Sequence, residues 1–467
     1  MPGKRLHKKR KGKLESVSFL CVLFWGAIYS LVFPPFSAPD ESAHFATAYL
    51  LSSQILGQET VNEEGLVLVR EEDAVLLSYS LDEEVYEQVF GRFFERDHSE
   101  ERIGYGHRPM DVSRHAYLPQ ALGITAGRLF GLGQIATIYL GRLFNLLFFA
   151  VCVFWAVRLA PFGRMAFLGV SLFPMTLELV SSLSYDALAI GLSLLFTAYA
   201  LYLAYDALAV NKRELVILGL LLGFLAPCKM IYIPLAGLCF LIPREKFGDR
   251  KRYLLAATAV ALCMAAGVLW INLDKIRVYF GGTEEAVGWA GGVQGYSISY
   301  VLAHPLQGLF VIGNTLVCRF PFYVNSMVGG RLGWMQYEVN EVFVIFFLFW
   351  TFLAVQPETG EKKRREEEST KRYQNAMPIT HRVVSLLLCL LTATAALLVM
   401  LLSWTPLDST VVEGVQGRYF LPVFPLVLLA VRSRQIWWKE SMQEIWIGGY
   451  CAANLLVILH LLWCISS

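Results

Sequence analysis

Long apolar runs, bounded by charged residues or by proline and glycine, recur along the whole chain. A helix rises about 1.5 Å per residue and the hydrocarbon core of a bilayer is about 30 Å thick, so about 20 apolar residues cross it. The pattern therefore predicts an all-α, polytopic integral membrane protein with about 11 transmembrane helices. The predicted spans are residues 17–33, 134–157, 165–182, 186–205, 215–226, 230–243, 253–271, 338–355, 383–404, 419–431 and 444–463.

The composition supports lipid as the main solvent of this protein. Of its 467 residues, 56% are hydrophobic and 17% are charged, whereas an ordinary soluble domain has about 25% charged residues. So few charges exclude a disordered chain and argue against a soluble enzyme. The net charge of +2 gives no indication of a nucleic-acid partner.

Lysine and arginine are concentrated in alternate loops, which predicts the orientation through the positive-inside rule. We expect a multi-pass protein with a cytoplasmic N-terminus and two large extracytoplasmic segments. The predicted organisation is a basic cytoplasmic tail (1–16), a polytopic membrane domain (17–435) and a C-terminal span (436–467); the membrane domain contains a first outer loop (34–133), a second outer loop (272–337) and a cytoplasmic linker (356–382).

The most distinctive polar motif follows the first predicted span. The sequence FPPFSAPDESAHF places Asp40, Glu41 and His44 directly after a proline-rich exit from the membrane. Pro39 suits the first turn of a helix predicted to run to about Leu56. His44 then shares a helix face with either acid. We predict Asp40 and Glu41 as catalytic residues, with one carboxylate as general base, or as ligands of a divalent cation such as Mg²⁺ or Mn²⁺, and His44 as substrate-binding.

A purely structural interpretation of this motif also exists. Ser37 and Asp40 have the spacing of a capping box, and acids in a first helical turn complement the helix dipole. Capping and chemistry therefore remain alternatives for the two acids.

A second polar motif, EGVQGRYFLP, begins the tenth predicted span. Its two glycines would let the backbone approach a ligand closely. We predict that Gln416, Arg418 and Tyr419 bind substrate, because arginine suits bidentate contact with a phosphate. The alternative is interfacial anchoring, in which Arg418 snorkels beside Tyr419 in the aromatic belt.

Ionisable side chains also occur within or beside the predicted spans. Asp186, Lys229 and Arg142 are the clearest examples, and charge at membrane depth is costly enough to indicate function. Asp186 and Lys229 are accordingly predicted to bind substrate. A structural ion pair of Asp186 with Lys229 or with Arg142 explains the same residues equally well.

The chain lacks the motifs of nucleotide-driven chemistry. No Walker loop, dinucleotide-binding glycine motif or zinc-protease motif is present in the sequence. An extracytoplasmic enzyme without cytosolic nucleotides needs a donor delivered through the membrane. A lipid-linked phosphate sugar meets that need.

Five short motifs together resemble a known family, the bacterial polytopic membrane proteins grouped as domain of unknown function 2142. The resemblance covers roughly residues 17–435. The motifs are PDESAHF at 39–45, YLPQAL at 117–122, SLSYDA at 182–187, GRLGW at 330–334 and GVQGRYFLP at 414–422.

That family in turn resembles the GT-C superfamily of glycosyltransferases, which take sugars from polyprenyl-phosphate carriers outside the membrane. The resemblance implies a GT-C-like fold in the bacterial plasma membrane, and Asp40 and Glu41 fall on the superfamily's acidic pair. Relatives commonly read Thr-Lys-Pro where this chain has Cys228, Lys229 and Met230, which makes a role for Lys229 less secure.

The leading hypothesis is therefore a glycosyltransferase that transfers a sugar from a polyprenyl-phosphate donor to a cell-surface polysaccharide, a teichoic acid or a lipid-linked glycan. Two alternatives remain open: a transporter or flippase for lipid-linked polysaccharide, and a non-catalytic subunit of an envelope assembly complex. A labelled donor and a glycan acceptor would distinguish transfer from translocation.

Overall fold

The structure of the chain is a computed structural model, which describes residues 3–74, 83–96, 101–280, 286–290, 292–358, 377–433, 435–439 and 442–466. Most of the predicted cytoplasmic linker, residues 359–376, lies outside the described residues.

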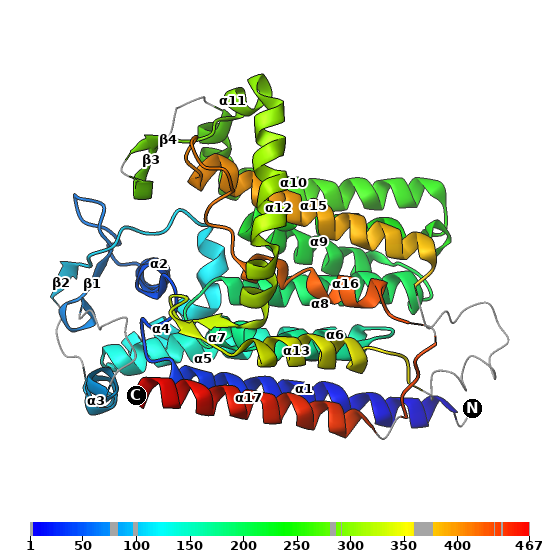
Figure 1. The fold of residues 1–467 in the computed structure, drawn as a ribbon, viewed down its shortest axis with the longest axis horizontal. Coiled ribbons are helices and arrows are strands. Elements are labelled where there is room, and N and C mark those ends of the chain that lie inside the picture. The colour runs from blue at the N-terminus through cyan, green and yellow to red at the C-terminus, as the bar shows by residue number, and fades with distance from the viewer. Residues whose placement is uncertain are drawn as a thin grey trace.

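Long helices that run roughly parallel to one another form the body of the molecule (Figure 1). Within the described ranges, six of them are long and apolar enough to cross a membrane. Four lie where spans are predicted from the sequence, and α1 and α10 extend further into the flanking basic segments. The six are α1 (Gly3–Val32), α5 (Gln134–Leu159), α8 (Asp186–Tyr205), α10 (Arg250–Phe280), α15 (Ile379–Trp404) and α17 (Gln443–Ser466).

The prediction of about eleven spans is not confirmed, because several apolar runs fold into shorter pieces. The run at 165–182 divides into α6 (Arg164–Ser171) and α7 (Pro174–Val180), since a proline begins the second helix. The remaining runs form α9 (Lys212–Cys228), the 3-10 helices η3 (Met230–Leu241) and η6 (Gly417–Phe420), α13 (Glu341–Ala354) and α16 (Phe424–Ala430).

The first long polar segment packs beside one end of these helices. It contains α2 (Glu41–Ile55), β1 (Leu68–Arg70), η1 (Glu71–Ala74), α3 (Glu83–Gly91), β2 (Arg102–Gly104), η2 (Arg114–Tyr117) and α4 (Leu118–Leu129). Strands β1 and β2 form an antiparallel pair in which Leu68 lies opposite Gly104.

The second polar segment contains one unexpectedly long helix. Helix α12 (Pro305–Val328) has 24 residues and stands across the parallel helices in Figure 1. Around it lie β3 (Ala286–Val287), η5 (Gly288–Ala290), β4 (Val293–Gln294), α11 (Ile298–Ala303), β5 (Arg331–Leu332) and β6 (Tyr337–Glu338); η4 (Arg244–Phe247) precedes α10.

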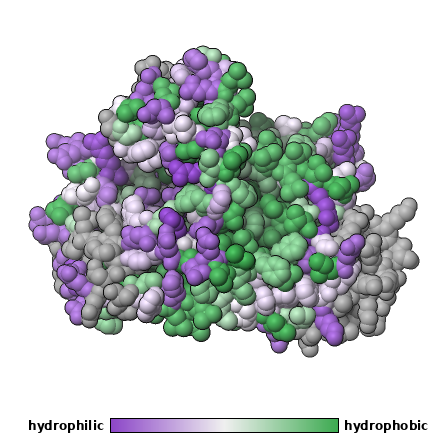
Figure 2. All heavy atoms as spheres, in the orientation of Figure 1, coloured by the Kyte–Doolittle hydropathy of each residue, from purple (hydrophilic) through white to green (hydrophobic). Residues whose placement is uncertain are grey.

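The surface divides in the same way as the fold. Figure 2 shows hydrophobic residues gathered over the parallel helices, and hydrophilic residues gathered over the two polar segments. Helix α8 lies inside the bundle, with most of its residues buried. Its first residue, Asp186, is therefore enclosed by protein at the end of the bundle that faces the polar segments.

Candidate functional site

Glu41 is held in a closed set of hydrogen bonds. Its side chain is fully buried, and Arg142 of α5 donates to both carboxylate oxygens, from Nε to Oε1 at 2.8 Å and from Nη2 to Oε2 at 2.5 Å. The backbone N–H groups of Phe36 and Leu183 donate to the same two oxygens at 2.9 Å each. Each oxygen thus accepts two hydrogen bonds.

Arg142 is saturated as well. It also donates to the backbone carbonyls of Ser30, Phe33 and Pro34, at 3.2, 2.5 and 3.0 Å. Because these carbonyls end α1 and lead into α2, Arg142 fixes the exit of the chain from the first span. We call Glu41 and Arg142 the closed pair.

Asp40 is placed very differently, although it is the next residue. Its backbone adopts the left-handed conformation, with φ 58° and ψ 14°, and its side chain makes no capping hydrogen bond. Aspartate tolerates this conformation better than most residues. Its side chain is 45% exposed.

The capping-box part of the structural interpretation is therefore wrong, whereas Glu41 does lie in the first turn of α2, where an acid complements the helix dipole. Ser37 donates its hydroxyl to the carbonyl of Pro34 at 2.6 Å, so it is not part of a capping box with Asp40. The helix begins at Glu41, whose carboxylate is bound by Arg142. Asp40 precedes this helix as its N-cap residue, and its side chain stays half-exposed.

Three further charges gather opposite Asp40. Lys229 at the end of α9 donates from Nζ to Oδ1 of Asp186 at 2.6 Å. Arg418 of η6 places Nε 3.6 Å from Oδ2 of Asp186 and Nη2 3.9 Å from Oδ2 of Asp40. We call Asp186, Lys229 and Arg418 the open cluster.

The predicted ion pair of Asp186 with Lys229 is confirmed. The alternative pairing of Asp186 with Arg142 is wrong, because Arg142 binds Glu41.

Arg418 is the least satisfied member of the open cluster. Its side chain is 9% exposed, and its Nε has no hydrogen-bond partner within the described residues. Both ionic contacts are longer than a hydrogen bond. A buried guanidinium without its bonds carries a desolvation cost that an anionic ligand would remove. The Oε1 atom of Gln416, two residues before, is likewise buried without a partner among the described residues.

A cavity of about 200 Å³ adjoins the open cluster. Lys229 lies over the rings of Tyr185 and Tyr419, with Nζ 5.0 and 4.3 Å from the ring centroids. The other walls combine polar and apolar residues: Asp111, Val112, Ser113, Pro227, Cys228, Met230, Ile231, Ala396, Val399 and Met400. The cavity thus joins a cationic end to an apolar wall from α15.

His44 lies beside the cluster without joining it. Its Nδ1 is 2.7 Å from the hydroxyl of Tyr117, and its ring packs edge-on against Tyr185. Burial, together with the positive charge of Arg418, lowers the pKa of His44 to about 3. The imidazole is therefore neutral at physiological pH and positions aromatic side chains around the site.

The glycines of the second motif serve packing. A Cβ on Gly417 would meet backbone atoms of Tyr323 and Met327 in α12, and the Gly417 N–H donates to Ser326 Oγ at 3.1 Å. Gly414 has a φ of 78°. The predicted close approach of backbone to a ligand is thus an approach to α12, and it fixes the position of Arg418.

The acidic pair fits a divalent cation poorly. Both oxygens of Glu41 are already used by Arg142 and by two backbone N–H groups. Asp40 is then the only carboxylate of the pair with a free face. Of the described residues, no three His, Cys, Asp or Glu side chains are grouped so as to hold a metal ion.

Two features of the site are not indicated by the sequence: the pairing of Glu41 with Arg142, and the tyrosines that surround His44. Arg142 was recognisable as a charge inside a predicted span, but its partner lies 101 positions away. Tyr117 and Tyr185 belong to motifs noted above, and nothing in their spacing indicates that both surround His44.

Comparison with protein families bears on the class of this molecule. The chain matches the family described as Predicted membrane protein (DUF2142) over residues 23–427. The protein therefore belongs to this family of membrane proteins. Comparisons with curated proteins and with solved structures gave no match.

Proposed function

We propose that this protein is a membrane glycosyltransferase of GT-C type that uses a polyprenyl-phosphate-linked sugar on the outer face of a bacterial plasma membrane. The observation that carries the proposal is the open cluster. The buried Arg418, whose Nε has no hydrogen-bond partner among the residues that the structure describes, lies beside Lys229 and opposite the half-exposed Asp40. Sugar transfer from a phosphate needs cations that stabilise the departing phosphate and a carboxylate that accepts the proton of the acceptor hydroxyl. The open cluster and Asp40 provide these two kinds of group.

The donor phosphate would bind the cationic side. Arginine and lysine stabilise the charge that develops on a departing phosphate, and they do so best where water is excluded. Lys229 also lines the cavity of about 200 Å³, whose apolar wall suits the first part of a polyprenyl chain. Gln416 and Tyr419, on the same segment as Arg418, would orient the donor.

Asp40 would act on the acceptor. In the proposed step, the Asp40 carboxylate takes the proton of an acceptor hydroxyl as that oxygen forms a bond to the anomeric carbon of the sugar. The bond between the anomeric carbon and the phosphate oxygen breaks, and the polyprenyl phosphate leaves with the electron pair. Arg418 and Lys229 stabilise the added negative charge.

Glu41 takes a different role from the one expected for the second acid. Because its oxygens are occupied, we assign it to positioning: with Arg142 it holds the segment that presents Asp40. The neutralising charge then comes from Arg418 and Lys229, and a cation shared by Asp40 and Glu41 is not part of the proposal.

The test uses the full chain in lipid nanodiscs with a panel of radiolabelled polyprenyl-phosphate hexoses and pentoses, and with cell-wall polysaccharide, teichoic acid and lipid-linked glycan as acceptors. We expect label in an acceptor with wild-type protein and none with Asp40→Asn. Movement of labelled donor across vesicles without any new glycosidic bond would instead establish a flippase, and neither activity would favour a non-catalytic subunit.

Donor recognition is tested separately from transfer. Polyprenyl phosphate without a sugar should bind wild-type protein, and Arg418→Gln should weaken that binding at least tenfold. Arg319→Gln is the matched control, because Arg319 of α12 pairs with Glu413 at a partly exposed position and is not a member of the open cluster. Equal binding by the wild type and both variants would assign Arg418 to interfacial anchoring.

A further inference from the structure

A second and larger cavity lies at the other end of α8. Its volume is about 550 Å³, within the range of pockets that hold ligands. At 1.5 Å per residue, Tyr202 lies about 24 Å along α8 from Asp186. The cavity is therefore far from the open cluster, and the proposed transfer makes no use of it. Its walls come from α5, α8 and α9: Trp155, Arg158, Leu159, Leu195, Tyr199, Tyr202, Arg213, Glu214, Ile217 and Leu221.

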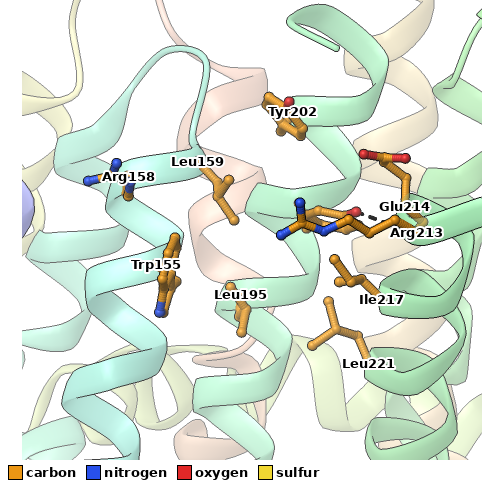
Figure 3. Close-up of a pocket in the computed structure, with 10 residues that line it drawn as sticks. Trp155, Arg158, Leu159, Leu195, Tyr202, Arg213, Glu214, Ile217 and Leu221 are labelled. Atoms are coloured by element: carbon orange, nitrogen blue, oxygen red, sulfur yellow. Dashed lines mark hydrogen bonds between the residues drawn. The ribbon is translucent and has the colours of Figure 1, made fainter. Parts of the chain in front are cut away.

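The lining is polar at one end and apolar at the other. Figure 3 shows Leu195, Ile217 and Leu221 together at one end, and Tyr202 and Arg213 toward the other. The polar end coincides with the ends of the helices, since α8 ends at Tyr205 and α9 begins at Lys212. The apolar end therefore reaches toward hydrocarbon depth.

Arg213 supplies the charge of this cavity. Its guanidinium extends into the space between α5 and α9 in Figure 3, and no described residue forms a salt bridge with it. The neighbouring acid, Glu214, is engaged elsewhere: its Oε2 accepts the N–H of Asn211 at 3.1 Å in a capping box. The positive end of the α9 dipole adds to the charge of Arg213.

The opposite wall carries a second, partly engaged arginine. Arg158 donates to Glu15 of α1 at 3.3 Å while 44% of its side chain stays exposed. Its guanidinium lies 5.6 Å from the ring centroid of Trp155, which lines the same wall. Tryptophan at the end of a membrane helix is typical of the interface between headgroups and hydrocarbon.

From this arrangement we propose that the cavity binds one anionic phospholipid, from the leaflet at which α1 begins. The headgroup phosphate contacts Arg213, and an acyl chain lies against Leu195, Ile217 and Leu221. Basic pockets between membrane helices recognise anionic headgroups in this way. A free phosphate would use the arginine alone and leave the apolar end unfilled.

The experiment measures lipid retention by the full chain. Protein in mixed micelles is titrated with dioleoyl phosphatidylglycerol or dioleoyl phosphatidylcholine, and bound lipid is counted by native mass spectrometry. We expect phosphatidylglycerol to be preferred by the wild type and about tenfold weaker with Arg213→Gln. Lys212→Gln is the matched control, because Lys212 is exposed and charged like Arg213 but does not line the cavity.

Two further arms identify the ligand. Leu221→Trp fills the apolar end and should also weaken phosphatidylglycerol retention, whereas Arg213→Lys keeps the charge and should retain most of it. Soluble glycerol phosphate should not compete. Equal losses with Arg213→Gln and Lys212→Gln, equal retention of the two lipids, or full competition by glycerol phosphate would each overturn the proposal. None of these results depends on sugar transfer.

Discussion

The closed pair and the open cluster both contain a carboxylate and an arginine, but they differ in how completely their hydrogen-bonding groups are satisfied within the protein. In the closed pair, both oxygens of Glu41 and the whole guanidinium of Arg142 are bonded within the protein. In the open cluster, Arg418 makes only long ionic contacts and leaves Nε unpaired within the described residues. The saturated pair holds the backbone between α1 and α2, whereas the unpaired Nε of Arg418 is the feature on which the proposed donor site rests.

The difference separates the roles of two adjacent acids. Asp40 and Glu41 are neighbours in sequence, yet the left-handed backbone at Asp40 turns the two side chains to different surroundings. The comparison predicts that substitutions of Asp40 change activity, and that substitutions of Glu41 change stability.

The largest expected effect is on activity. Asp40→Asn removes the proposed general base, which contributes about 100- to 10000-fold to a rate. Because the Asp40 side chain is half-exposed and makes no capping hydrogen bond, the melting temperature should stay within about 2 °C of the wild type, since surface changes alter stability by about 0.5 kcal/mol. Transfer assays and thermal melts on the same preparation measure both quantities. Wild-type rates with the asparagine variant would contradict the assignment.

The next effect is on stability. Glu41→Gln leaves Arg142 buried without its counter-charge, and breaking a buried pair costs about 3–5 kcal/mol. We expect little folded protein in the membrane, measured by size-exclusion chromatography of a fluorescent fusion.

The double variant Glu41→Gln with Arg142→Met is the informative control. It removes the unpaired charge and should recover part of the folded fraction. If the single glutamine variant folded as well as the wild type, the closed pair would not be the support of this segment.

A smaller effect should follow from crowding the support of Arg418. Gly417→Ala places a Cβ against the backbone of Tyr323 and Met327, and overpacking costs about 1–3 kcal/mol. Thermal stability should fall, and binding of polyprenyl phosphate should weaken with it. Gly448→Ala is the control, because a Cβ there meets nothing within 4 Å.

The smallest effect concerns pH. The pKa of His44, about 3 in the folded protein, is lower than its ordinary value of 6.5. The unfolded chain therefore binds a proton more readily, so stability is complete above about pH 6.5 and falls as the pH drops toward 3. Between pH 8 and pH 5.5 the loss due to His44 is about 1.4 kcal/mol.

Denaturation at the two pH values, compared between wild type and His44→Gln, measures this loss. Burial also lowers the pKa values of His107 and His115, so both titrate in the same direction and the difference between the two proteins is the relevant quantity. An identical pH dependence in both proteins would show that His44 does not contribute to the pH dependence of stability.

The sequence predicts the parts of this molecule that depend on local pattern. The apolar runs at 134–157, 186–205 and 383–404 become long helices, and Asp186 pairs with Lys229 as one interpretation had it. Hydropathy alone does not show where a helix breaks, because proline can stand within an apolar run. In the structure such a proline begins a new, shorter helix, as Pro174 does at the start of α7.

Other features depend on tertiary contacts that no local pattern encodes. The partner of Arg142 is decided by how the chain folds back after α1, where three carbonyls become available to its guanidinium. Likewise, the motif predicts a close approach of the Gly417 backbone but not that its partner is the backbone of α12. Helix α12 mixes polar and apolar residues, so the apolar pattern places it within the second outer loop, 272–337, and predicts no membrane span there.

The closed pair also has a mechanical consequence. Arg142 joins the end of α1 to α5, and Glu41 joins the start of α2 to the segment before α8. Asp40 is thereby carried on a rigid frame of three membrane helices. Arg418 is held separately, because the hydrogen bond between the Gly417 N–H and Ser326 Oγ joins η6 to α12. A donor that binds between Asp40 and Arg418, as proposed, would thus bridge two separately anchored parts of the molecule.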